Sequence, residues 1–180
     1  MPSLHALLEV LTPPNQPAST GTPEQWVKAE RLLGTSLPSD YKAYTRSFGS
    51  GIIGAFIRPF NPFTKNNVLN LIHASRQILA ICRSNKEECG DEVCPYPLFP
   101  EADGLLPWGD TVNGDVLFWQ THGTPDSWNI VVGSLRDDVY ERFEGPMTQF
   151  LTRVLTGEID SALLSELVDK HTPFEPFDTV

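Results

Sequence analysis

The segment Asp115–Glu144, with the sequence DVLFWQTHGTPDSWNIVVGSLRDDVYERFE, decides the expected fold. Three runs in it are rich in β-branched and aromatic residues, and short stretches containing Gly, Pro and Asp separate them. The runs are Asp115–Thr121, Trp128–Ser134 and Val139–Glu144. Because such short connections join neighbouring antiparallel strands, the segment predicts a β-meander. The first run carries apolar side chains on both faces, so we expect its strand to be central in the sheet and covered on both sides.

Helices are expected around this meander. Thr22 and Gln25 flank Pro23 in the pattern of a capping box, and Gly34 ends the periodicity that follows. The predicted helices are Leu4–Leu11, Pro23–Leu33, Ser39–Phe48, Val68–Arg83, Ile159–Lys170, and one after Gly145-Pro146 whose apolar stripe is Met147, Phe150, Leu151, Val154 and Leu155. Helices that come early, strands that come late and a closing helix indicate an α+β fold with a largely antiparallel β-sheet.

The remaining segments are expected to be extended or irregular. Ile52–Phe60 is predicted to be one extended segment, and Ser84–Pro100 a surface loop because of its prolines and charges. Tryptophans on strands and helix stripes are expected in the core, whereas Trp108, in a Pro-Trp-Gly loop, is expected to be the most exposed. We expect a short N-terminal helix and Pro-rich linker at 1–21, a single domain at 22–157, and a C-terminal helix and tail at 158–180.

The charge of the chain is strongly asymmetric. The 180 residues carry a net charge of −10, which argues against nucleic-acid and anionic-membrane binding because both need a basic face. Residues 1–100 hold 9 Lys and Arg against 8 Asp and Glu, whereas residues 101–180 hold 4 against 15. The excess acid therefore lies on the predicted meander and its surroundings, and it favours a basic partner.

Cysteine usage and the N-terminus indicate the compartment. The three cysteines, Cys82, Cys89 and Cys94, cannot all pair, and a disulfide framework would have a larger, even number. The first Lys or Arg is Lys28, so the N-terminus lacks the basic region of a signal peptide. No stretch approaches the roughly 18 consecutive apolar residues of a membrane helix. We expect a soluble, cytoplasmic protein.

The sequence shows no pattern typical of a catalytic or metal-binding site. Phe48-Gly49-Ser50-Gly51 follows a predicted helix and lacks the spacing of a nucleophile elbow, so we interpret it as a helix end and turn. Asp110–Asp115 does not fit the register of a calcium loop, and Asn113-Gly114 predicts a tight turn instead. The cysteines and histidines lack the spacing of a zinc site. We therefore predict no catalytic residues, no metal and no cofactor.

Several short motifs occur together in a recognisable order. They are Trp26 with Glu30, Leu37-Pro38 followed by Ser39-Asp40-Tyr41, Gly49, Trp108-Gly109, Asn113-Gly114-Asp115, Trp119 and Trp128. In this order and spacing, from about Thr22 to Gly157, the chain resembles the SUKH superfamily, which is related to the Smi/Knr cell-wall-assembly regulators. The resemblance implies an α+β fold with a largely antiparallel sheet, and implies that these residues are structural rather than catalytic.

The resemblance also implies two functions that the residues leave open. Bacterial members are typically immunity proteins, which bind and neutralise a toxin encoded beside them, often a nuclease. Fungal relatives act as regulatory scaffolds in cell-wall synthesis. For an immunity protein, an acidic surface would cover the basic active-site region of the cognate toxin. The residues expected to contact this toxin are Asp137, Asp138, Glu141 and Glu144 first, and Asp103, Asp110 and Asp126 second.

Overall fold

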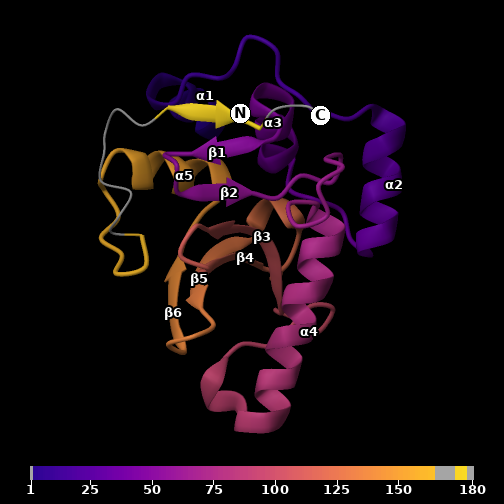
Figure 1. The fold of residues 1–180 in the computed structure, drawn as a ribbon, viewed down its shortest axis with the longest axis vertical. Coiled ribbons are helices and arrows are strands. Elements are labelled where there is room, and N and C mark those ends of the chain that lie inside the picture. The colour runs from indigo at the N-terminus through magenta and orange to yellow at the C-terminus, as the bar shows by residue number, and fades with distance from the viewer. Residues whose placement is uncertain (1, 165–172, 178–180) are drawn as a thin grey trace.

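Seven antiparallel strands and five α-helices make up the described part of the chain, which comprises residues 2–164 and 173–177 of a computed structural model (Figure 1). The helices are α1 (Pro2–Val10), α2 (Pro23–Leu33), α3 (Ser39–Phe48), α4 (Leu71–Cys89) and α5 (Met147–Leu155). The strands are β1 (Gly51–Ile53), β2 (Ile57–Pro59), β3 (Leu105–Thr111), β4 (Val116–Gln120), β5 (Asn129–Ser134), β6 (Val139–Phe143) and β7 (Phe174–Pro176). The predicted α+β fold is confirmed.

The sheet has the strand order β6-β5-β4-β3-β2-β1-β7. The three strands predicted from residues 115–144 are β4, β5 and β6, and consecutive strands of this meander pair antiparallel. In β4, Val116, Leu117, Phe118 and Trp119 are all buried, so this strand is covered on both faces as predicted. β6 lies at one edge of the sheet and β7 at the other.

The central strand β3 was not predicted, and the expected exposure of Trp108 is wrong. Trp108 lies on β3 and is 0% exposed, with its ring near those of Trp119 and Phe150. The sequence Pro-Trp-Gly reads as a loop because proline is normally excluded from central strands. Here the pairing with β4 shifts between Pro107 and Gly109, and β2 pairs only from Gly109 onward. A bulge thus accommodates the proline.

Two more parts of the sheet differ from the prediction. The single extended segment Ile52–Phe60 is instead a hairpin, in which β1 and β2 pair at Ile53 and Ile57 around a turn. The C-terminal strand β7 then pairs with β1, although its prolines indicated only a tail. Gly51 makes this pairing possible, since a Cβ there would lie 2.2 Å from Phe174 Cζ. The contact comes from residues 123 positions apart, which local patterns do not reveal.

Four of the helices follow the sequence patterns closely, whereas α4 is longer than predicted. Helices α2 and α3 have the predicted bounds, and Thr22 and Gln25 form the predicted capping box. Helix α4 begins at Leu71, where Asn70 caps it, and continues to Cys89 through residues predicted to be a loop. The charges of 84–89 are compatible with a helix because they lie on an exposed surface and no proline interrupts them.

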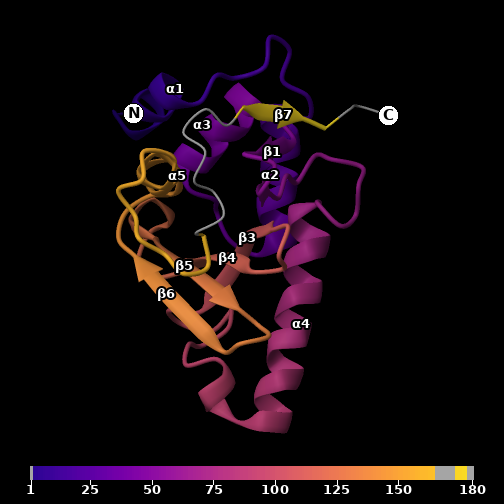
Figure 2. The same ribbon diagram turned by 60° about the vertical axis from the view of Figure 1, so that its left-hand side comes forward.

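The helices cover the sheet in two layers (Figures 1 and 2). On one face, Trp119 packs edge-on against Tyr41 of α3, and Phe143 packs against Phe150 of α5. The opposite face is covered by α4, which packs against β3, and by Tyr96, which contacts Tyr140 of β6. Strands β4 and β5 are therefore buried between these layers, whereas β6 is partly exposed at the edge of the sheet.

The N-terminal helix packs onto the same core. It was predicted at Leu4–Leu11 and is observed as α1. Leu7 and Leu11 are fully buried, and α1 packs against α5 and α3 (Figure 2). The Pro-rich segment after α1 is tied to the body, since the backbone of Ser50 donates to the carbonyl of Ala18 at 3.1 Å. Residues outside 22–157 thus contribute to one hydrophobic cluster. Of the predicted helix Ile159–Lys170, residues 159–164 are not helical, and the remainder lies outside the described residues.

Candidate functional site

The register of the sheet divides the predicted acidic contact residues between its two ends. One row of paired residues crosses the sheet from β3 to β6. It consists of Asp110 (β3), Val116 (β4), Gly133 (β5) and Tyr140 (β6). Asp137 and Asp138 lie in the β5–β6 turn just beyond that row, at the same end as Asp110. Glu141 lies within β6, and at the other end of the sheet are Asp103, Asp126 and Glu144.

The turn between β5 and β6 is an exposed acidic feature, and we call residues 136–139 the hairpin tip. Asp137 and Asp138 are both exposed, and Asp138 has a positive φ of 55°. Arg136 Nη2 lies 3.1 Å from Asp137 Oδ2, and this hydrogen bond holds the pKa of Asp137 below its usual value. Val139 follows and is 42% exposed. The tip thus combines two carboxylates with an exposed apolar side chain on the edge strand.

Asp110 and Glu141 are engaged within the fold. The Arg58 guanidinium donates to both carboxylate oxygens of Asp110 at 2.8 Å, a bidentate pair across β2 and β3. Burial raises the pKa of Asp110, and the hydrogen bonds from Arg58 oppose that shift. Glu141 accepts hydrogen bonds from the Ser161 hydroxyl and from the backbone of Ala162. These two carboxylates therefore position neighbouring segments.

The three acids at the opposite end also have internal partners. His122 Nδ1 lies 2.6 Å from Asp103 Oδ1, and Arg142 Nη1 lies 3.8 Å from Glu144 Oε1. Asp126 Oδ1 accepts from the backbone N–H of Ser39 at 2.6 Å, and that bond lowers the pKa of Asp126. Ser39 begins α3, whose own N-cap residue, Pro38, makes no side-chain cap. Asp126 is thus a capping group supplied from a distant loop.

The residues of the family pattern occupy core and turn positions. Glu30 accepts from the backbone N–H of Leu37 at 2.8 Å and forms an ion pair with Lys42, which joins α2 to α3. Gly49 has a φ of 71°, and a Cβ there would lie 2.1 Å from the carbonyl oxygen of Ala18. The buried members are Trp26, Leu37, Pro38, Asp40, Tyr41, Gly49, Trp108, Gly109, Asp115, Trp119 and Trp128.

The predicted turn at Asn113-Gly114 is confirmed. Gly114 has a φ of 91°, and its backbone N–H donates to Thr111 at 3.0 Å. The buried carboxylate of Asp115 accepts from the Thr111 hydroxyl, which in turn accepts from the Asp115 backbone. Asp115 therefore closes the β3–β4 turn, and no ion is needed to explain its place.

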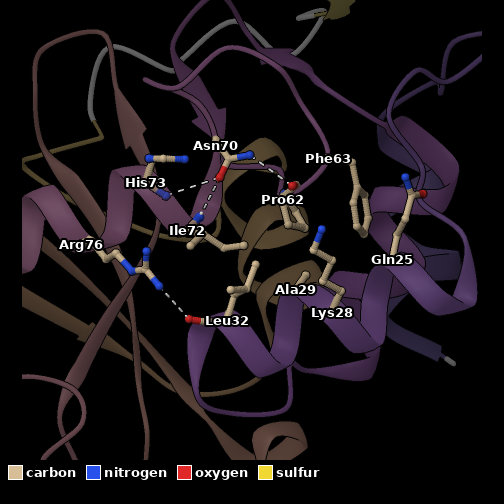
Figure 3. A pocket seen from close by; sticks show the side chains of 10 residues that line it. All are labelled: Gln25, Lys28, Ala29, Leu32, Pro62, Phe63, Asn70, Ile72, His73 and Arg76. Atoms are coloured by element: carbon tan, nitrogen blue, oxygen red, sulfur yellow. Dashed lines mark hydrogen bonds between the residues drawn. The ribbon is translucent and has the colours of Figure 1, made fainter.

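A groove between α2 and α4 is a second surface feature, which the sequence analysis missed; Figure 3 shows the part of it lined by residues from Gln25 to Arg76. It consists of two adjoining hollows of about 360 and 440 Å³ that share Leu32 and Arg76. Arg76 Nη2 donates to the carbonyl oxygen of Leu32 at 3.0 Å where the hollows meet. We call this feature the α2–α4 groove. Its other lining residues are Gln25, Lys28, Ala29, Leu33, Gly34, Pro62, Phe63, Asn70, Ile72, His73, Ser75, Leu79, Arg83, Phe99, Pro100 and Leu106.

The electrostatics of the α2–α4 groove differ from those of the chain as a whole. Lys28, Arg76 and Arg83 line it together with His73, whereas none of its lining residues in the described part of the chain carries a carboxylate. A sequence signal for this site exists: His73, Arg76 and Arg83 are spaced by three and seven residues, which puts them on one face of a helix. The overall charge of −10 obscured it.

The described residues contain neither a metal cluster nor a membrane-spanning helix. Within 2–164 and 173–177, no group of three or more His, Cys, Asp or Glu side chains is arranged to hold a metal ion. None of the described helices is both long enough and apolar enough to cross a membrane. The hairpin tip and the α2–α4 groove are two surfaces of the described residues on which a function can be built.

Comparison with protein families identifies a family that this chain matches. Residues 23–151, which are 129 of the 180 residues, match the model SUKH_6, described as SMI1-KNR4 cell-wall. The match begins at the first residue of α2 and ends within α5, and so includes the strands from β1 to β6. No curated protein gives a significant match.

Proposed function

The chain belongs to the SMI1-KNR4 family, SUKH_6, and from this premise we propose that it is a non-catalytic binding module of the immunity type. In this proposal it acts in the cytoplasm, where it binds a toxin protein with a basic surface and neutralises it. The observation that carries the proposal is the hairpin tip, where Asp137 and Asp138 project beside exposed Val139 on the edge strand. The remaining acids predicted as contacts add negative potential at greater distance.

The chemistry of the hairpin tip suits a basic protein partner. Enzymes that act on nucleic acids present Lys and Arg at their active sites, and an acidic binder accelerates its encounter with such a surface by electrostatic steering. Val139 supplies the apolar contact that a charged rim alone lacks, since interface cores are depleted in charge. A tight turn between two paired strands also loses little conformational entropy on binding.

Asp137 and Asp138 contribute differently to this surface. Arg136 offsets the charge of Asp137, so the pair acts as a dipolar group at the tip. Asp138 makes no hydrogen bond or ion pair with the described residues, and its carboxylate is the one that a basic partner would meet first. The proposal therefore assigns Asp138 a larger share of the binding free energy than Asp137.

A second candidate is a regulatory module that binds an endogenous protein. The family description refers to the cell wall, which favours this reading. The two candidates share the absence of a catalytic role and differ in the partner. In the first the partner is a toxin, and in the second it is a component of a synthetic or signalling pathway.

Co-expression separates these candidates. The product of the gene adjacent to this one is expressed in a test host, with and without this protein, and growth is measured together with co-purification. The immunity proposal predicts that the adjacent product arrests growth alone, that growth is restored by this protein, and that the two proteins co-purify. A harmless adjacent product that does not co-purify would contradict it and favour the regulatory candidate.

A further inference from the structure

The α2–α4 groove has an apolar floor and a cationic rim. Ile72, Leu79 and Leu106 are buried beneath it, and Leu32 stands 47% exposed between its two hollows. In Figure 3, Lys28 extends its ammonium group toward Pro62 and Phe63, across the hollow from α4. A ligand in the groove would thus meet apolar side chains below and positive charge at the sides.

The arginines of the rim are held in place without losing their charge. Arg76 Nη2 donates to the carbonyl of Leu32, and Arg83 Nη2 donates to the carbonyl of Phe99 at 2.5 Å. Carbonyl oxygens are neutral acceptors, so each guanidinium keeps its full positive charge and further donors for an anionic partner. By contrast, Arg58 and Lys42 are paired with Asp110 and Glu30.

The dimensions of the groove favour a short extended chain over a compact ligand. Its lining on α4 extends from Asn70 to Arg83, which corresponds to about 20 Å along a helix axis. An extended peptide at about 3.3 Å per residue covers that length with about six residues. The two hollows then accept two side chains, one on either side of Leu32 and Arg76.

We propose that the α2–α4 groove is a docking site for an extended acidic segment of a partner protein, about six residues long. Carboxylates of that segment pair with Arg76, Arg83 and Lys28, and its apolar side chains enter the two hollows. The charge of this site is opposite to that of the hairpin tip, and none of its lining residues belongs to the tip. The protein would thus have two binding surfaces, and this one does not depend on the proposed function of the tip.

A peptide selection tests the proposal directly. A phage-displayed library of random heptapeptides is selected on the purified full chain, and enriched peptides are synthesised and their affinities measured by fluorescence anisotropy. The proposal predicts enriched peptides that contain Asp or Glu together with Leu or Phe. Their affinity should fall by about tenfold or more in Arg76→Gln/Arg83→Gln, and should weaken as salt rises.

Matched variants keep the test independent of folding. Arg31→Gln/Arg46→Gln removes two exposed charges outside the groove and should leave affinity unchanged. Lys28→Gln removes a rim charge that makes no hydrogen bond or ion pair with the described residues, and should weaken binding even if the double arginine variant unfolds. Peptides without acidic residues, no enrichment, or equal affinity for the groove variants would overturn the proposal. NMR chemical shifts of groove residues that change with protein concentration would show that a second copy of this chain occupies the groove, and would also overturn the proposal.

Discussion

Asp40 caps a helix to which it does not belong. Its Oδ2 accepts a hydrogen bond from the backbone N–H of Thr148 at 2.8 Å and another from the Thr148 hydroxyl at 3.1 Å, although 108 positions separate the two residues. Thr148 lies in the first turn of α5, whose N-cap residue, Pro146, makes no side-chain cap. The carboxylate in α3 therefore satisfies an otherwise unpaired donor of α5 and fixes the two helices against each other.

Removing this cap should destabilise the fold. Asp40 is only 5% exposed, so Asp40→Ala leaves the buried N–H of Thr148 without its acceptor, and we expect a loss of about 2–3 kcal/mol in the free energy of unfolding. Asp40→Asn keeps an acceptor oxygen and should lose much less. Urea denaturation measures both. A double-mutant cycle with Thr148→Ala should give a coupling energy of about 1 kcal/mol or more. A coupling of zero would show that the contact does not stabilise the fold.

The same carboxylate should make stability depend on pH in a defined direction. Burial raises the pKa of Asp40 above its usual 3.8, and the hydrogen bonds from Thr148 oppose this shift. The folded state then binds the Asp40 proton more tightly than the unfolded state, so protonation favours folding. As the pH falls from 7 through the raised pKa toward 3.8, wild type should gain stability relative to Asp40→Asn. A difference between the two proteins that is constant over this range, measured by urea denaturation, would refute the assignment.

The long-range cap of α3 makes a separate prediction. Asp126→Ala removes the acceptor for the backbone N–H of Ser39 and should cost about 1 kcal/mol of unfolding free energy. The matched control is Asp138→Asn, which also removes one exposed charge and retains a residue that tolerates the positive φ at this position. It should leave the thermal midpoint unchanged. Equal midpoints for the two variants would exclude the capping role of Asp126.

The N-terminal helix should contribute measurably to stability. Leu7 is fully buried where α1 packs against α5, and Leu7→Ala should lower the free energy of unfolding by about 2–4 kcal/mol in one cooperative transition. Leu8→Ala is the control, because Leu8 is 37% exposed on the same helix. If Leu7→Ala behaved like Leu8→Ala, or if α1 unfolded in a separate early transition, the helix would not share the core with residues 22–157.

Local patterns predicted the parts of this fold that local chemistry determines. The capping box at Thr22 and the period-two runs of β4 to β6 depend on residues close in sequence, and these elements occur where expected. The central strand β3 was missed because Pro107 and Gly109 disrupt the local signal, while pairing on both sides supplies the stability. Strand β7 was missed because its partner, β1, is more than 120 residues away.

The candidate site shows the same division between local and long-range information. Sequence charge correctly located an excess of acid in residues 101–180, but it did not reveal that Asp110 pairs with Arg58, that Asp126 caps α3, or that Glu141 binds Ser161. Each partner lies at least 20 positions away. The charges of α4 in the α2–α4 groove do follow a local pattern, but Lys28 and the apolar side chains of α2 that complete the groove lie 40 or more positions away in sequence.

The most direct test of the central claim is the affinity of this protein for the purified product of the adjacent gene, measured by calorimetry at 50 and 300 mM salt. Asp137→Asn/Asp138→Asn is compared with Glu101→Gln/Glu175→Gln, which removes the same amount of charge away from the hairpin tip. If the hairpin tip is the contact, the first variant binds about tenfold or more weakly and loses much of its salt dependence, whereas the second binds nearly as wild type does. Identical affinities and salt dependence for the two variants would contradict the account.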